Sequence, residues 1–334
     1  MKPAVSVCIP VWNSEQYLDE CLESVFAQDF AGFEVVVVND SSPGSDSSGR
    51  TCRQIVKQAH KRHKKSGCLK VSYIEHSENR GLVECRRTLI NAAHGAFILM
   101  LDSDDVLKPG AISALWTLQE QHGTDIVAGG FDIFPEAKDS RRFPLYDGFI
   151  PGSELFSVWL IQKKYTSFLW AKLIRTDVFR RAMEKIPYTY CNMAEDFLIW
   201  FFITQTAQSF FATSLTVYGY RRNSGMSSAR KITTLEQCRQ ICSAASVFTN
   251  IFLYIDEQTQ NAAPPLTDEQ LYAIGRTAEN YVKSNITQIK TLALPELVPE
   301  AMQMLKDAWG EELVERMEKA KRNAAEWLVK SGIV

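Results

Sequence analysis

The chain lacks an apolar run long enough to cross a membrane. The longest notable run, residues 197–203, is far shorter than the roughly 18 residues that a spanning helix needs. Residues 5–11 are too short for a secretory leader and lack a basic lead-in and a cleavage site. None of the eight cysteines forms a C-x-x-C pair, and Cys238 and Cys242 have no histidine at ligand spacing. We therefore expect a cytoplasmic protein with free thiols and no structural zinc, soluble or peripheral at the inner face of a membrane.

An excess of charge of one sign is also missing. Lys and Arg total 37 and Asp and Glu total 39, so the net charge of −2 indicates no nucleic-acid partner. The one basic run lies within residues 57–65. It is typical of a solvated helix end, and contact with an anionic membrane surface is the alternative. Hydrophobic residues make up 46% of the 334 residues, which is enough for one large domain or two ordinary ones.

Two common phosphate-binding motifs are absent. The first apolar run, residues 5–9, is followed by Pro10-Val11-Trp12-Asn13 and not by G-x-G-x-x-G, which argues against a standard dinucleotide fold. No G-x-x-x-x-G-K-[ST] segment occurs anywhere, which argues against a P-loop NTPase.

What the chain does show is a regular alternation of strands and helices over its first 135 residues. Amphipathic stretches predict the helices, of which the first is capped by Asn13 or Ser14 and the fourth begins with Pro109. This alternation predicts an α/β fold, with a doubly wound and mostly parallel sheet flanked by helices. Apolar runs predict the strands at residues 5–9, 33–38, 69–75, 96–101 and 125–134.

The pattern changes after residue 135. Helices are predicted at residues 152–162, 176–183 and 195–207, and a strand at residues 215–221. From residue 231 onward the chain reads as wholly helical, with two long apolar stripes that need burial. We expect this C-terminal region to form a helical bundle packed against the rest of the chain.

The most informative feature is the acidic stretch Asp102-Ser103-Asp104-Asp105, which directly follows the buried strand predicted at residues 96–101. Three carboxylates so close together repel one another, at a cost of roughly 1–4 kcal/mol for each close pair. A divalent cation such as Mn²⁺ or Mg²⁺ removes that cost, because hard cations prefer carboxylate oxygens. Asp40 follows the second strand, and strand ends of this kind line one ligand-binding edge.

Several segments together resemble one known family. They are residues 5–13, 34–42, 79–86 and 95–105, in the family's order and spacing. On these segments the chain resembles the inverting family 2 glycosyltransferases of the GT-A fold. A weaker resemblance continues through Trp170-Ala171-Lys172-Leu173, Glu195-Asp196 and Tyr220-Arg221.

The resemblance implies a division of the chain. A GT-A domain would occupy residues 1–230, with a nucleotide-sugar-binding half at 1–135 and an acceptor half at 136–230. The helical C-terminal region would occupy residues 231–334.

The resemblance also implies a role for individual residues. Asp104 would ligate the metal together with Asp102, and Asp196 of the Glu195-Asp196 pair would be the catalytic base. Trp12 stands where the family usually has Tyr and would stack on the uracil base. The residues implied to bind the nucleotide sugar are Pro10, Val11, Trp12, Asn13, Asp40, Arg80, Arg86, Asp102 and Ser103.

Three further positions depart from the family's pattern. Arg87 and Leu89 replace the usual Asn and Gly in the helix after Leu82, which would reshape that wall of the site. Asn223 stands near the position where many members have His, so a third protein ligand to the metal is in doubt.

The implied reaction is transfer of a sugar, with inversion, from a nucleotide-diphosphate donor to an acceptor hydroxyl. UDP-sugar is the expected donor, a saccharide or a lipid-linked molecule the expected acceptor, and bacterial surface polysaccharide or glycoconjugate synthesis the expected setting. A nucleotidyltransferase and a non-catalytic nucleotide-sugar-binding relative are the alternatives. A peripheral membrane contact and a homodimer through the C-terminal helices are left open by the sequence.

Overall fold

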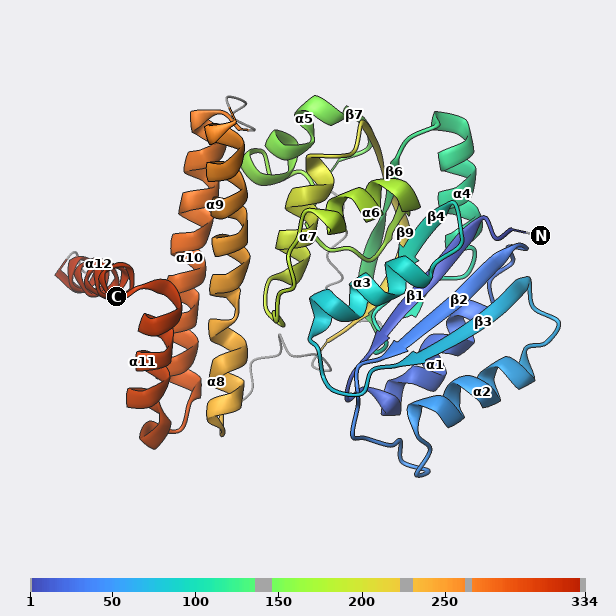
Figure 1. The fold of residues 1–334 in the computed structure, drawn as a ribbon, viewed down its shortest axis with the longest axis horizontal. Coiled ribbons are helices and arrows are strands. Elements are labelled where there is room, and N and C mark those ends of the chain that lie inside the picture. The colour runs from blue at the N-terminus through green and yellow to red at the C-terminus, as the bar shows by residue number, and fades with distance from the viewer. Residues whose placement is uncertain (1, 136–145, 223–230, 262–265, 331–334) are drawn as a thin grey trace. The chain divides into compact units, whose positions relative to one another are not determined.

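The computed structural model describes residues 2–135, 146–222, 231–261 and 266–330 (Figure 1). Its contacts divide the chain into two compact units. The first unit comprises Met1–Thr189 and Ile199–Ser228. The second comprises Tyr190–Leu198 and Ala229–Val334. The short segment Tyr190–Leu198 therefore clusters with the C-terminal helices, although residues 199–228 separate it from Ala229 in the sequence.

The first unit is built on one nine-stranded sheet of order β3-β2-β1-β4-β8-β6-β9-β5, with β7 paired to β9. Strands β3, β2, β1 and β4 run parallel, and β8 joins β4 to β6 with antiparallel pairing on both sides. The sheet is therefore mixed. The four strands β3, β2, β1 and β4 are parallel to one another, and the antiparallel pairs begin at β8. The strands are β1 (Val5–Val11), β2 (Phe33–Asn39), β3 (Cys68–Glu75), β4 (Phe97–Met100), β5 (Val106–Leu107), β6 (Ile126–Phe134), β7 (Gly148–Pro151), β8 (Lys172–Arg175) and β9 (Ser209–Arg221).

Helices cover both faces of this sheet. Helix α1 packs on α2 and β1, and α4 packs on β6, β8 and β9. Helix α3 packs on β1 and β2 from the opposite face, beside α6 (Figure 1). Helix α7 (Glu195–Thr204) begins in the second unit and ends in the first. The helices of the first unit are α1 (Glu15–Phe26), α2 (Cys52–Arg62), α3 (Leu82–Ala92), α4 (Ala111–His122), α5 (Gly152–Phe156) and α6 (Thr176–Glu184).

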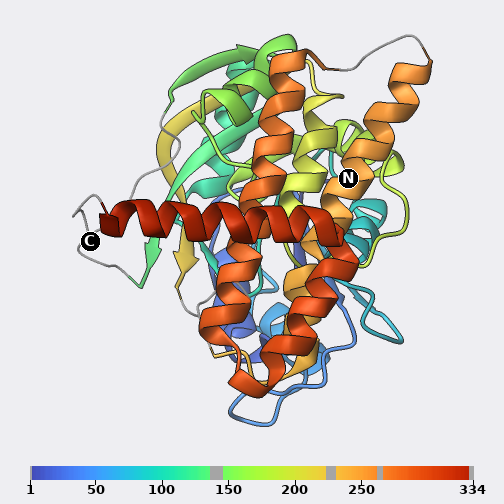
Figure 2. The same cartoon turned by 90° about the vertical axis from the view of Figure 1, so that its left-hand side faces the viewer.

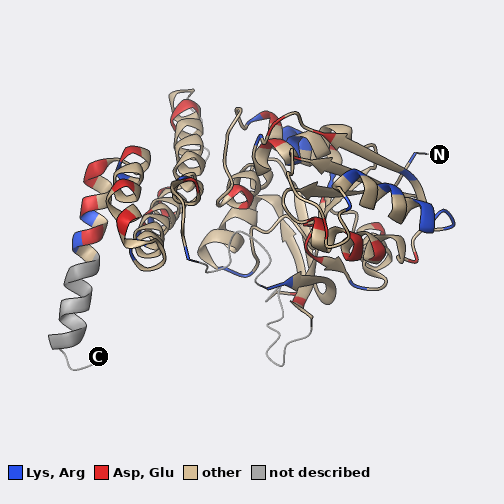
Figure 3. Ribbon diagram, turned by 90° about the horizontal axis from the view of Figure 1, so that it is seen from below, with Lys and Arg blue, Asp and Glu red and all other residues tan. Residues whose placement is uncertain are grey.

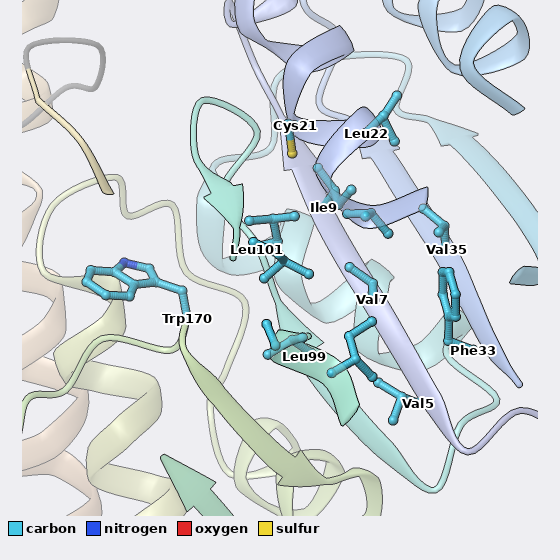
Figure 4. Packing of buried hydrophobic residues seen from close by; sticks show 14 of the residues in the cluster. Val5, Val7, Ile9, Cys21, Leu22, Phe33, Val35, Leu99, Leu101 and Trp170 are labelled. Atoms are coloured by element: carbon cyan, nitrogen blue, oxygen red, sulfur yellow. The ribbon is translucent and has the colours of Figure 1, made fainter. Parts of the chain in front are cut away.

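The core follows from the alternation of side chains along the central strands. Val5, Val7 and Ile9 of β1 are fully buried and pack with Leu22 of α1 (Figure 4). Full burial of each such side chain contributes roughly 1.5–3 kcal/mol to the hydrophobic free energy of folding. Val11 belongs to the same cluster, and the alternate residues Ser6, Cys8 and Pro10 are buried too, so every position of the strand is buried.

The second unit contains a helical bundle. Helix α12 lies across α10 and α11 (Figure 2). Apolar residues such as Val282, Ile286 and Leu305 form its core, while acidic and basic residues alternate along the described start of α12 (Figure 3). Capping boxes at Thr234 and Thr267 begin α8 and α10. The helices are α8 (Leu235–Cys242), α9 (Ala244–Gln260), α10 (Asp268–Leu292), α11 (Val298–Trp309) and α12 (Glu311–Lys330).

Most predicted elements are confirmed, but several details were wrong. Strand β9 begins at Ser209 and not at residue 215, and the side chain of Ser14 does not cap α1. Helix α4 begins at Ala111, because Pro109 and Gly110 form the turn before it. Strands β5 and β8 were not predicted, since two and four residues are too few to show a period. The helix predicted at residues 152–162 is α5 followed by a π-helical turn, Ser157–Ile161.

The basic run is confirmed as the end of α2 and the loop after it, visible in blue at the right-hand edge of Figure 3. Among the described residues, no helix is both long and apolar enough to span a membrane. The domain boundaries at residues 135 and 230, and the packing of the bundle against the first unit, stay predictions.

Candidate functional site

The site is built around the loop of residues 102–105, which we call the aspartate loop. It leaves the sheet where the N–H of Leu101 donates to the carbonyl of Cys8, one strand away in β1, at 3.0 Å. The N–H of Asp105 then donates to the carbonyl of Asp102 at 3.0 Å and closes a tight turn. This turn leaves Asp102 and Asp104 partly exposed and buries Ser103 and Asp105.

Asp105 holds this loop in place and is not itself exposed to a ligand. Its Oδ2 accepts a hydrogen bond from the Tyr218 hydroxyl at 2.6 Å, and its Oδ1 accepts one from the N–H of Arg221 at 2.7 Å. Burial, followed by the negative charges of Asp104 and Asp102, raises the pKa of Asp105 to about 8. The charges of Asp102 and Asp104 thus disfavour ionisation of their buried neighbour, and β9 supplies the hydrogen-bond partners of Asp105.

Arg221 is a second support that the sequence showed only as a weak resemblance. Its Nε donates to the carbonyl of Asp104 at 2.7 Å, and its Nη2 donates to Glu20 at 2.5 Å. The guanidinium also lies over the ring of Tyr17, 4.8 Å from the ring centre. Arg221 thus joins the backbone of the aspartate loop to α1.

Asp102 and Ser103 have partners of their own. Nη2 of the buried Arg86 lies 3.3 Å from Oδ1 of Asp102. The hydroxyl of Ser103 is hydrogen-bonded to that of Ser14 at 2.6 Å. Ser14 is the residue before α1, but its side chain contacts Ser103 and does not cap the helix. Contacts of Arg86 and Ser103 with a nucleotide stay predictions.

Asp40 lies at the end of β2, and its carboxylate organises the neighbouring loop. Oδ1 accepts hydrogen bonds from His76 Nδ1 at 2.6 Å and from the N–H of Arg80 at 3.0 Å. Oδ2 accepts from the N–H of Gly81 at 2.9 Å, and Gly81 has a φ of 85°, which favours glycine. Asp40 is buried, so its carboxylate is held by these donors from the loop after β3.

His76 was missed by the sequence interpretation. Its Nε2 is hydrogen-bonded to Thr88 of α3 at 2.9 Å, while Nδ1 faces Asp40. Because an ionised carboxylate only accepts hydrogen bonds, Nδ1 carries the proton in this pair. A polar residue directly after β3 was the available signal, since strand ends line the same edge as Asp40.

The end of β1 completes this edge. Pro10 and Val11 are buried, and Val11 belongs to the core cluster, whereas the ring of Trp12 is 38% exposed. Asn13 has a positive φ of 53°, and its N–H donates to the hydroxyl of Ser42 at 2.7 Å. Of these residues, Trp12 offers the largest exposed surface to a planar ligand.

The first unit therefore brings together most of the predicted residues. Trp12, Asp40 and Asp102 follow the carboxyl ends of β1, β2 and β4, which are adjacent parallel strands. Glu195 and Asp196 are instead at the start of α7, within the part of the chain that clusters with the second unit. Asn223 lies outside the described residues.

The donor set of the aspartate loop fits a hard divalent cation. Asp102 and Asp104 offer carboxylate oxygens, and their charges already disfavour ionisation of Asp105. No group of three or more His, Cys, Asp or Glu within the described residues could hold a metal by protein ligands alone. Two carboxylates suffice for Mg²⁺ or Mn²⁺ when substrate phosphates and water complete the shell.

Arg87, one of the departures from the family's pattern, has a clear structural role. Its guanidinium donates to Glu84 within α3 and to the carbonyls of Met183, at 2.7 Å, and Ile186, at 2.8 Å. It thereby satisfies carbonyls at the C-terminal end of α6. Arg87 thereby joins α3 to the end of α6 and to the residues after it, and a changed wall of the site stays a prediction.

A mostly parallel sheet flanked by helices, with acidic residues at adjacent strand ends and C-terminal helices, defines the GT-A fold class. The family model described as glycosyl transferase family 2 matches residues 6–186, more than half of the 334 residues. The chain belongs to this family.

Comparisons with individual proteins agree. Glycosyltransferase GlyA of Streptococcus pneumoniae is 26% identical over 230 residues, which cover 66% of this chain and 31% of that protein. EpsJ of Bacillus subtilis, named an uncharacterized glycosyltransferase, is 32% identical over 143 residues, covering 43% of this chain and 38% of that protein. The chain thus spans under half the length of these relatives.

A solved structure supports the fold over almost the whole chain. Staphylococcus aureus TarS 1–349 in complex with UDP-GlcNAc matches with a TM-score of 0.56 and 18% identity. The match covers 97% of this chain and 92% of the TarS chain. At this level of identity, the likeness concerns the fold.

Proposed function

We propose that this protein transfers a sugar from a nucleotide-diphosphate donor, UDP-linked, to an acceptor hydroxyl with inversion of the anomeric configuration. The observation that carries the proposal is the aspartate loop beside Asp40 at adjacent strand ends, in a chain of glycosyl transferase family 2. TarS, whose name describes a poly(ribitol-phosphate) β-N-acetylglucosaminyltransferase, supports a UDP-sugar donor and a role in bacterial surface polysaccharide or glycoconjugate synthesis.

The donor would bind along this edge of the first unit. The exposed ring of Trp12 would stack on the base, and Oδ2 of Asp40 would accept a hydrogen bond from the base or ribose. Asp102 and Asp104 would hold Mn²⁺ or Mg²⁺, which as a Lewis acid stabilises the negative charge of the departing diphosphate. The supports from Tyr218 and Arg221 would keep both carboxylates in a fixed orientation.

Asp196 would act as the general base on the acceptor hydroxyl. The anomeric carbon gains oxocarbenium character as the diphosphate departs, so the incoming hydroxyl must lose its proton. Inversion requires this attack from the face opposite the leaving group. We assign this role to Asp196 because it matches the second acid of the family's Glu-Asp pair, with Glu195 as its neighbour. The acceptor would be a saccharide or a lipid-linked molecule.

The experiment that tests the proposal is a thermal-shift screen of nucleotide sugars, with Mn²⁺ and with EDTA. A ligand present at 100 times its Kd stabilises the folded protein by about 2.7 kcal/mol, which a melting curve detects. We expect a UDP-sugar to raise the melting temperature with Mn²⁺ and to lose most of that effect with EDTA. If no nucleotide sugar shifts the curve, the proposal fails. Turnover of a nucleoside triphosphate with a sugar phosphate would instead indicate a nucleotidyltransferase.

A further inference from the structure

We propose that the C-terminal helices hold the proposed catalytic acid in position, through Phe248 of α9 and Tyr281 of α10. We call Tyr190–Leu198, which contains Glu195 and Asp196, the acidic segment. The inference rests on the proposed role of Asp196 and assigns a task to the helical region that the sequence left open. Phe248 and Tyr281 are positioning residues, because they act through the acidic segment.

Polar contacts fix the first half of the acidic segment to the junction between α8 and α9. The thiol of Cys191 is 3.6 Å from the carbonyl of Ser243, and the N–H of Asn192 donates to the Ser243 hydroxyl at 3.3 Å. Cys191 is fully buried, and Met193 packs against the apolar core of the bundle. This half of the segment is thus attached to the second unit through Cys191, Asn192 and Met193.

Aromatic contacts fix the other half. The ring of Phe197, directly after Asp196, lies 5.4 Å from that of Phe248 and 6.4 Å from that of Tyr281. Phe248 also contacts Tyr281, at 5.4 Å, and Trp309 of α11, at 5.5 Å. Helices α9 and α10 therefore contact the side chain next to the proposed base, and Trp309 of α11 packs behind Phe248.

The backbone shows why such anchoring is needed. Ala194, the residue before α7, has a φ of 63°, a left-handed conformation that is strained for any residue with a Cβ. Strained backbone persists where its surroundings over-determine it. The contacts of Cys191 and Phe197, on either side of Ala194, supply that constraint and thereby set where α7 begins.

Tyr281 also interacts electrostatically with Asp196 and Glu195. Burial, followed by the negative charges of Asp196 and Glu195, raises the pKa of its hydroxyl well above the ordinary value. The phenol therefore stays neutral at physiological pH and adds no negative charge beside the proposed base.

The consequence for catalysis is specific. A misplacement of a reacting group by about 1 Å can cost on the order of 10²-fold in rate. The proposed donor site, in contrast, is formed by residues of the first unit. Loosening the acidic segment should lower kcat and leave the affinity for UDP unchanged. A general loss of stability would instead change kcat and the affinity for UDP together. Well below the melting temperature it would change neither quantity.

The test compares two variants of the full-length chain with matched controls. Phe248→Leu and Tyr281→Leu remove the ring contacts with Phe197, while Phe252→Leu on α9 and Tyr272→Leu on α10 remove exposed rings of the same type from the same helices. Amide hydrogen exchange reports the protection of the acidic segment, calorimetry reports the Kd for UDP with Mn²⁺, and a UDP-release assay reports kcat.

We expect Phe248→Leu to speed exchange in the acidic segment, to lower kcat by about tenfold or more, and to leave the Kd for UDP within about twofold. Tyr281→Leu should lower kcat by a smaller factor, because its ring lies farther from Phe197, and both controls should match the parent protein. Unchanged exchange in the acidic segment of both variants, or faster exchange with an unchanged kcat, would overturn the inference. An active Asp196→Asn variant would refute the proposed base instead, and the exchange data would still decide whether the helices hold the segment.

Discussion

The hydroxyl of Tyr218 donates to the buried carboxylate of Asp105 at 2.6 Å. The same hydroxyl accepts a hydrogen bond from the N–H of Asp102 at 3.2 Å, so one side chain connects both ends of the aspartate loop. The ring of Tyr218 is in turn stacked on Trp170, with centroids 4.5 Å apart. Asp105 is therefore a support for the loop, and Asp102 and Asp104 are the two acids that would hold the cation.

Tyr218→Phe should destabilise the protein and weaken donor binding. The substitution keeps the aromatic stack but leaves the buried carboxyl group of Asp105 and the N–H of Asp102 without this partner, which costs about 1–3 kcal/mol for each buried group. Urea unfolding measures the loss of stability, and calorimetry measures the affinity for UDP. Tyr272→Phe, at an exposed tyrosine of α10, is the control and should change neither quantity. Equal stability of the parent and Tyr218→Phe would contradict the supporting role of this hydrogen bond.

Asp104→Asn should lower donor affinity and turnover together. Asparagine retains the size of the side chain but removes one of the two negative charges that would bind the cation. Calorimetry with UDP, in Mn²⁺ and in EDTA, measures the effect, and Asp177→Asn at an exposed position of α6 is the control. Equal UDP affinity of the parent protein in Mn²⁺ and in EDTA would show that the metal has no role in binding.

His76→Ala should weaken UDP binding by about tenfold, because a hydrogen bond to a charged group contributes roughly 1.5–3 kcal/mol and here orients Asp40. His60→Ala, at an exposed histidine of α2, is the control. In an Asp40→Asn background the same His76 substitution should have little further effect, since the two residues act as one unit. Fully additive losses in this double-mutant cycle would mean that His76 does not act through Asp40.

Asp196→Asn should lower kcat by roughly 10²–10⁴ and leave UDP affinity intact, as expected for the loss of a general base. Glu195→Gln is the matched comparison, because it removes the adjacent charge from the same helix start. Residues 195 and 196 point about 100° apart on a helix, so they cannot serve the same hydroxyl equally well. An inactive Glu195→Gln beside a near-normal Asp196→Asn would reverse the assignment.

The alternating half of the fold was predictable from sequence for a physical reason. Strands such as β1 and β2 are buried on both faces and therefore read as continuous apolar runs, and α1 shows a clear helical period. Strand β8 was not predictable, because Lys172–Arg175 is short and its burial depends on antiparallel partners distant in sequence.

The acids of the site were predictable, but not their partners. Asp40 and Asp102 directly follow apolar runs, so their place at strand ends could be derived from the chain alone. That His76 would orient Asp40, or that Tyr218 would bond Asp105, depends on contacts across 36 and 113 residues of sequence. The attachment of the acidic segment to the C-terminal helices is a long-range property of the same kind.

The most direct test of the account is the stereochemistry of turnover, followed by proton NMR. The UDP-sugar identified by thermal shift is incubated with the protein and Mn²⁺, and the anomeric signal of the first product is recorded before mutarotation. Water can serve as the acceptor, so the natural acceptor need not be known. We predict release of UDP and a β-configured product from an α-linked donor, abolished in Asp196→Asn. An α-configured product, or no UDP release from a donor that binds, would contradict the account.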